Sequence, residues 1–158
     1  MEQNPEVEKA FAEAEAAKKV AQNYVESLKN NDFNFKHQNK PSRNIYLIMK
    51  LFYLIIQPNE QMPGDDIKKE LPNMKNKCLI FAEAQLKKIM LDRINNISWI
   101  TPEYLNKVQM YTNPPFTDPK AMENISVGCK VVTCYFQNVL NYKRLYDIYE
   151  NLKNKSQK

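Results

Sequence analysis

A scarcity of glycine constrains this chain more than any other feature of its sequence. Only two glycines, Gly64 and Gly128, occur among 158 residues, against nine prolines. Tight turns between strands usually need glycine, and strands need β-branched residues that alternate with polar ones. Neither signal is present, so we expect an all-α fold in which prolines separate the helices.

The longest stretch without proline follows Thr117-Asp118-Pro119. A polar cap followed by proline is a common helix start, because the first helical turn does not use the missing N–H. We predict one helix from Asp118 to about Leu152. Apolar and aromatic side chains recur along it in alternating steps of three and four, which predicts a lengthwise contact with another helix. They are Val132, Tyr135, Val139, Tyr142, Tyr146 and Tyr149.

The first predicted helix, about Glu6 to Leu28, has the same spacing, with Lys18 as its one interruption. Two such helices at opposite ends of one chain pair most simply as an antiparallel coiled coil, which brings Phe11 toward Tyr146 and Tyr149. The candidate contact residues are Val7, Phe11, Ala14, Ala21, Val25 and Leu28.

This pairing predicts a small helical head on a short two-helix stem. Residues 1–30 form the outgoing helix of the stem, residues 31–127 the head, and residues 128–158 the returning helix. Within the head we expect helices from about Met74 to Ile94 and from Thr101 to Tyr111.

The helix that Ser42 caps is the most apolar of the head, because almost every residue from Ile45 to Ile56 is hydrophobic. Other helices must wrap it, which leaves one polar stripe for solvent or a partner. That stripe contains Arg43, Tyr46, Lys50, Tyr53 and Gln57. In the short helix after Thr101 we expect Leu105 and Val108 to be buried, with Trp99 as a core anchor before it.

The sequence shows no grouping of catalytic or metal-binding side chains. The single histidine, His37, lies in a polar stretch, and the pair Asp65-Asp66 stands where a helix start favours acids. Glycine-rich phosphate loops are missing, and the three cysteines have neither zinc-site nor disulfide spacing. They are Cys78, Cys129 and Cys134. We therefore predict a non-catalytic protein with no cofactor and no metal.

Basic residues are concentrated in the first part of the head. The net charge is +5, and residues 31–58 carry Lys36, Lys40, Arg43 and Lys50 against the single acid Asp32. A basic face favours an acidic partner. The apolar run at residues 45–56 is shorter than the ~20 residues that span a bilayer, and no signal peptide opens the chain. We expect a cytosolic protein with no membrane partner.

The second half of the chain contains the stretch LDRINNISWITPEYLNKVQMYTNPPFTDPKAMENISVGCKVVTCYFQNVLNY, and the first half contains KPSRNIYLIMKLFYLI. Both resemble the microtubule-binding domain at the stalk tip of dynein heavy chains. That family has a turn of the Asn-Pro-acidic-Phe-Thr-Pro kind before a helix of the type V-S-K-A-C-K-S-L-C-M-W-V-R-A-M-x-x-Y, and an earlier helix of the type N-P-P-P-L-V-K-L-V-M-E-A-V-C-I-L. The matching positions are Asn113, Pro114, Pro119, Ile125, Ser126, Cys129, Lys130, Val132, Tyr135 and Tyr142, and earlier Pro41, Ile45, Leu47, Ile48 and Met49.

The resemblance implies a helical head that docks on the acidic surface of tubulin in the microtubule. It implies no catalysis in this chain, since the ATP-hydrolysing motor ring of the parent dynein is a separate part. It also implies a place in the cytoplasm and cytoskeleton, with the axoneme of a cilium or flagellum as one setting. The candidate microtubule-binding residues are Lys36, Lys40, Arg43, Tyr46, Lys50, Lys107, Lys120 and Lys130.

The chain departs from the family at several cations. Family members carry lysines where this chain has Ala121, Asn124 and Val127, and a lysine where it has Tyr46. Fewer cations weaken the attraction to an acidic surface. We therefore expect weak affinity for microtubules.

Two other classes of function fit some of the same features. A helical coiled-coil adaptor without tubulin binding explains the two predicted contact stripes, and a nucleic-acid binder explains the basic stretch. Aromatic side chains do not alternate with the cations there as a stacking platform would require, so we expect no nucleic acid as partner. The adaptor remains the alternative to the microtubule-binding head.

Overall fold

The computed structural model describes residues 4–37, 40–79 and 81–156. These ranges contain helices and connecting segments and no strand, so the all-α class is confirmed. Seven α-helices follow one another. They are α1 (Pro5–Ser27), α2 (Arg43–Ile56), α3 (Ile67–Met74), α4 (Glu83–Asn95), α5 (Pro102–Lys107), α6 (Pro119–Ile125) and α7 (Val127–Ser156). Shorter 3-10 helices span Asn30–His37 and Gln109–Thr112, and a π-helix spans Lys75–Leu79.

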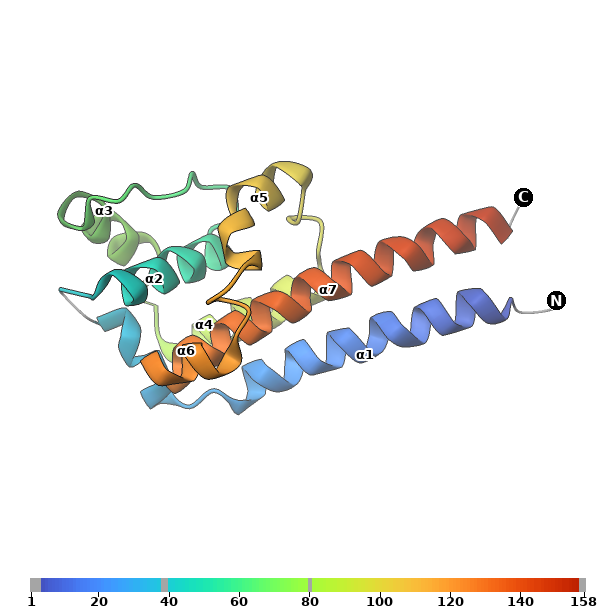
Figure 1. Ribbon diagram of the computed structural model, residues 1–158, viewed down its shortest axis with the longest axis horizontal. Coiled ribbons are helices and arrows are strands. Elements are labelled where there is room, and N and C mark those ends of the chain that lie inside the picture. The colour runs from blue at the N-terminus through green and yellow to red at the C-terminus, as the bar shows by residue number, and fades with distance from the viewer. Residues whose placement is uncertain (1–3, 38–39, 80, 157–158) are drawn as a thin grey trace.

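Helices α1 and α7 lie side by side and run in opposite directions (Figure 1). The N- and C-terminal ends of the chain are therefore at the same end of the molecule, and α2 to α6 gather toward the other end (Figure 1). The rings of Phe11 on α1 and Tyr149 on α7 are 5.2 Å apart, so the predicted approach of these two side chains is confirmed.

Small side chains form the buried face of α1. They recur in steps of three and four, which places them on one side of the helix, where α7 packs. The buried residues are Ala10, Ala14, Ala17, Ala21 and Val25. The sequence prediction included Phe11 in this face, but 45% of the Phe11 side chain is exposed. It missed Ala10 and Ala17, because a search for large apolar residues gives alanine little weight.

The other predicted contact residues divide between two surroundings. Leu28, Val132, Val139 and Tyr142 are buried, whereas Tyr146 and Tyr149 are half-buried. Tyr135 is fully buried, but its hydroxyl donates to the Met90 carbonyl on α4, so it joins the core rather than only the contact with α1.

The predicted single helix from Asp118 to Leu152 is wrong, because the chain leaves helical geometry at Ser126. The backbone of Ser126 is extended, and its N–H donates to the Met122 carbonyl as α6 ends. Its Oγ accepts a hydrogen bond of 3.0 Å from the N–H of Cys129 in the first turn of α7. One serine thus closes one helix and caps the next.

Helix α2 is the centre of the core, and all its residues from Tyr46 to Ile56 are buried. Tyrosine hydroxyls from other segments reach its backbone: Tyr104 donates to the Leu54 carbonyl and Tyr111 to the Leu47 carbonyl. The guanidinium of Arg93 donates to the carbonyls of Ile55 and Ile56 at 3.0 and 2.9 Å. The bonds from Arg93 and Tyr104 satisfy carbonyls in the last turn of α2, at its buried C-terminal end.

Two other helix predictions need correction. The predicted helix from Met74 to Ile94 is interrupted, since the backbone of Ala82 is extended and α4 begins only at Glu83. The predicted burial of Leu105 is wrong, because 41% of this side chain is exposed. The buried face of this region is Tyr104, Val108 and Tyr111, in steps of four and three.

Trp99 is half-buried and contacts the Tyr104 ring edge-on, with ring centres 4.9 Å apart.

None of the helices in the described ranges has both the length and the apolar character that crossing a bilayer requires.

Candidate functional site

The eight residues predicted to bind a microtubule lie in different surroundings. Lys40, Arg43 and Lys120 are exposed. Tyr46 and Lys50 are buried. Lys107 and Lys130 are half-buried, and the side chain of Lys36 lies outside the described residues.

The exposed cations belong to two helix starts. The start of α2 and the whole of α6 lie toward the end of the molecule opposite the two termini (Figure 1). Ser42 caps α2, and its first turn holds no acidic residue, so the positive end of the helix dipole adds to the charge of Arg43. Asp118 caps α6 through hydrogen bonds from the N–H groups of Lys120 and Ala121.

The predicted polar stripe on α2 does not face solvent. Tyr46, Lys50 and Tyr53 are only 2, 4 and 2% exposed. The irregular segment after α2, residues 57–66, folds back over this side of the helix, and Tyr46 donates a hydrogen bond of 2.7 Å to the carbonyl of Gly64. The expectation that this stripe faces solvent or a partner is therefore wrong for Tyr46, Lys50 and Tyr53.

Lys50 has an internal partner. Its Nζ lies 2.9 Å from Asp65 Oδ1 and 5.0 Å from the centre of the Tyr46 ring. The hydrogen bond from Lys50 lowers the pKa of Asp65. Burial, aided by the nearby charges of Glu70, Asp65 and Asp66, raises the pKa of Tyr46 to about 12. Lys50 therefore holds the covering segment in place instead of offering its charge to solvent.

Two further lysines hold the same segment. Lys107 Nζ donates to the carbonyls of Pro58 and Glu60 at 2.8 and 2.7 Å, and burial lowers the pKa of Lys107. Lys77 pairs with the Glu60 carboxylate at 2.8 Å. Segment 57–66 is thus fixed by lysines from α2, from α5 and from the π-helix.

Lys130 links the two helices that meet at Ser126. Its Nζ lies 2.7 Å from Glu123 Oε2 on α6, while Lys130 itself is in the first turns of α7. This hydrogen bond lowers the pKa of Glu123 and raises the pKa of Lys130. The charge of Lys130 is therefore partly neutralised within the molecule.

Sequence reasoning missed the role of Asp65, although one signal pointed to it. Lys50 is the only charged residue in the apolar run of residues 45–56. A charge in such surroundings needs a partner, because a buried unpaired ion is very unfavourable. The nearest acids along the chain after this helix are Glu60, Asp65 and Asp66.

Three of the four positions where the resembled family carries lysine lie on and just after α6, and the fourth is the buried Tyr46 of α2. Asn124 and Val127 are exposed, with 53% of Val127 accessible, and Ala121 is half-buried. Two of the three positions can thus receive a long side chain without a clash in the core.

In the ranges that the structure describes, no three His, Cys, Asp or Glu side chains come together as possible metal ligands. Cys129 and Cys134 are buried as separate thiols, and burial raises the pKa of Cys129.

Comparison of this chain with protein-family models, with curated proteins and with solved structures finds no match.

Proposed function

We propose that this chain is a microtubule-binding module, in which α1 and α7 form a coiled-coil stem and residues 31–127 form a head similar to the dynein stalk tip. The observation that carries the proposal is the antiparallel packing of α1 along α7, with both chain ends at one end of the pair. The start of α2 and helix α6 lie at the other end. A head held in this way presents its exposed cations away from the ends of the stem.

In this proposal Lys40, Arg43 and Lys120 provide the attraction to the acidic tubulin surface. All three are exposed, and none of them belongs to a salt bridge among the described side chains. Exposed cations attract an acidic surface at long range, and this attraction weakens as salt rises. The neutral residues at Ala121, Asn124 and Val127 make the binding weak.

The head performs no catalysis in this proposal. Its place is the cytoskeleton, and the force-producing ATPase ring is a separate part of the parent motor that the stem joins. A coiled-coil adaptor is the second candidate. It is favoured by the apolar residues of α1 and α7 that are partly exposed, which are Phe11 (45%), Val20 (41%), Val127 (53%) and Ile148 (41%).

Co-sedimentation with taxol-stabilised microtubules tests the proposal. The variant Arg43→Glu/Lys120→Glu reverses two exposed head cations, whereas Lys9→Glu/Lys155→Glu makes the same charge change on the exposed ends of α1 and α7. We expect the head variant to lose at least about tenfold in affinity at low salt, since each desolvated charge pair is worth about 1 kcal/mol, and the control to lose little.

Equal losses in the two variants would show that the attraction is general charge and not a docking face. If the native chain does not sediment with microtubules at low salt, the adaptor becomes the better assignment.

A further inference from the structure

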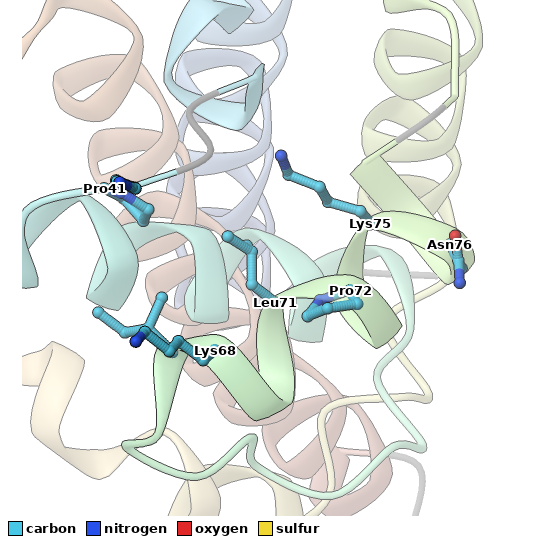
Figure 2. A pocket seen from close by; sticks show the side chains of 8 residues that line it. Pro41, Lys68, Leu71, Pro72, Lys75 and Asn76 are labelled. Carbon is cyan, nitrogen blue, oxygen red and sulfur yellow. The ribbon is translucent and has the colours of Figure 1, made fainter.

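A pocket of about 640 Å³ lies between the segment before α2 and one side of α3. Its size falls in the range of about 300–1,000 Å³ that is typical of ligand sites. Pro41, from the segment before α2, forms one wall, and Ile67, Leu71 and Pro72 of α3 form the floor. Leu71 lies between Pro41 and Pro72, and the side chains of Lys68 and Lys75 extend on either side of it (Figure 2).

The lining of the pocket combines an apolar floor with cations. Lys40, Lys68 and Lys75 all border it, and no described residue that lines it is acidic. The lining residues of α3 and the turn that follows lie on one side of the helix, in two adjacent rows with a spacing of four. One row is residues 67, 71 and 75, and the other is residues 68, 72 and 76. The acid of α3 points elsewhere: the Glu70 carboxylate lies against Gly64, 3.4 Å from where a Cβ would stand there.

The positions of the charges indicate what kind of anion fits. Lys68 and Lys75 are seven residues apart, which is about 10 Å along a helix. A fatty acid or another ligand with a single carboxylate reaches only one of them. Side chains of an extended peptide alternate between its two faces, and the chain rises about 3.3 Å per residue, so acidic side chains at positions i and i+4 share one face about 13 Å apart, within reach of both flexible lysines. The apolar side chain at position i+2 is on the same face and lies over Leu71.

We propose that this pocket binds an extended acidic peptide segment, which places one apolar or aromatic side chain on the floor made by Pro41, Ile67, Leu71 and Pro72 while its carboxylates meet Lys40, Lys68 and Lys75. The apolar contact supplies affinity, and the cations select acidic sequences over neutral or basic ones. The first turn of α2, free of acidic residues, adds a weak positive field at the edge of the pocket. This inference does not depend on microtubule binding.

The test uses the full chain and a fluorescein-labelled peptide of glutamates and glycines with one central phenylalanine, followed by fluorescence anisotropy. Three control peptides have phenylalanine replaced by alanine, every glutamate replaced by glutamine, or every glutamate replaced by lysine. We expect binding of the first peptide only, with affinity that falls as salt rises. Equal binding of the alanine peptide would show that no apolar side chain enters the pocket, and the proposal would be wrong.

Three variants locate the site. Lys40→Glu/Lys68→Glu should weaken binding at least tenfold at low salt, and Lys9→Glu/Lys155→Glu, with the same change of net charge, should leave it within about twofold. Asn76→Trp places a large ring at the exposed edge of the pocket and should abolish binding while thermal unfolding stays unchanged. If the two double variants weaken binding equally, or Asn76→Trp leaves it intact, the proposal is wrong.

Two further outcomes would assign the pocket to another occupant. Co-sedimentation with phosphatidylserine vesicles that Asn76→Trp abolishes, without peptide binding, would indicate a membrane surface. Concentration-dependent dimerisation that Asn76→Trp abolishes would indicate a second copy of the chain. Both measurements are made without microtubules, so failure here and failure of the proposed function are separate results.

Discussion

Lys50 on the most apolar helix of the chain pairs with Asp65 from the segment that covers it, with 2.9 Å between Nζ and Oδ1. The side chain of Lys50 is 5% exposed and that of Asp65 is 76% exposed, so a buried cation is neutralised from the surface. Such a pair adds little to the free energy of unfolding, because removing the Lys50 ammonium from water costs about as much as the pairing returns. Its main effect is to fix where the covering segment lies.

Replacement of Lys50 tests this view of the pair. In Lys50→Met the charge is removed and the volume is nearly kept, so we expect the free energy of unfolding in urea to stay equal or to rise by about 1–4 kcal/mol. Asp65→Ala should instead lower the urea midpoint, because it leaves the buried ammonium unpaired. The same Asp65→Ala change in the Lys50→Met background should have little effect, and an equal effect in both backgrounds would contradict the coupling.

The pair also predicts a dependence of stability on pH. The hydrogen bond from Lys50 lowers the pKa of Asp65, so the folded state binds a proton there less readily than the unfolded state. The stabilisation is therefore complete above the ordinary pKa of about 4 and is lost as the pH falls through the lowered value. We expect the difference in urea midpoint between the native chain and Asp65→Asn to be constant from about pH 5 to 8 and to shrink below about pH 4. A difference that does not change at acid pH would contradict this cause.

The alanines of α1 predict a strong effect of side-chain size. Ala14 is 1% exposed and faces α7, whereas Ala16 is exposed. Ala14→Leu should lower the free energy of unfolding by about 1–3 kcal/mol, because the added atoms force the two helices apart. Ala16→Leu adds the same atoms in solvent and should change it by less than about 0.5 kcal/mol. Equal effects in urea denaturation would mean that Ala14 is not enclosed by α7.

Restored lysines test the expected weakness of microtubule binding. Asn124→Lys/Val127→Lys adds two exposed cations on and beside α6, and we expect affinity to rise at least about tenfold at low salt. The gain should disappear as salt rises, since it is electrostatic. As a control, Asn124→Gln/Val127→Gln adds length without charge. No gain at any salt would place the docking face elsewhere.

The sequence predicted the helix caps well, because a cap depends on neighbouring residues. Ser42, Thr101 and Asp118 were expected to begin helices, and each accepts a hydrogen bond from the backbone two or three residues later. The all-α class followed in the same way from the shortage of glycine. These features need no knowledge of distant contacts.

Contacts between distant segments could not be predicted in the same way. The polar stripe of α2, which the sequence predicts to be exposed, is covered by residues 57–66. The sequence of this segment has no hydrophobic periodicity, so nothing in it indicates which surface the segment covers. The break at Ser126 was missed because serine is tolerated inside helices, and its extended backbone depends on packing around it. The pocket combines Pro41 with residues 67–76, which no local pattern brings together.

The tyrosine hydroxyls that join the core helices have an optical consequence. Tyr104, Tyr111 and Tyr135 donate to buried carbonyls, and burial raises the pKa of all three. Accessible phenols ionise near pH 10, whereas these three give up their protons only when the fold opens. Tyrosinate absorbance in an alkaline titration should therefore rise in two stages, and the second, cooperative stage reports global unfolding without any added dye or label.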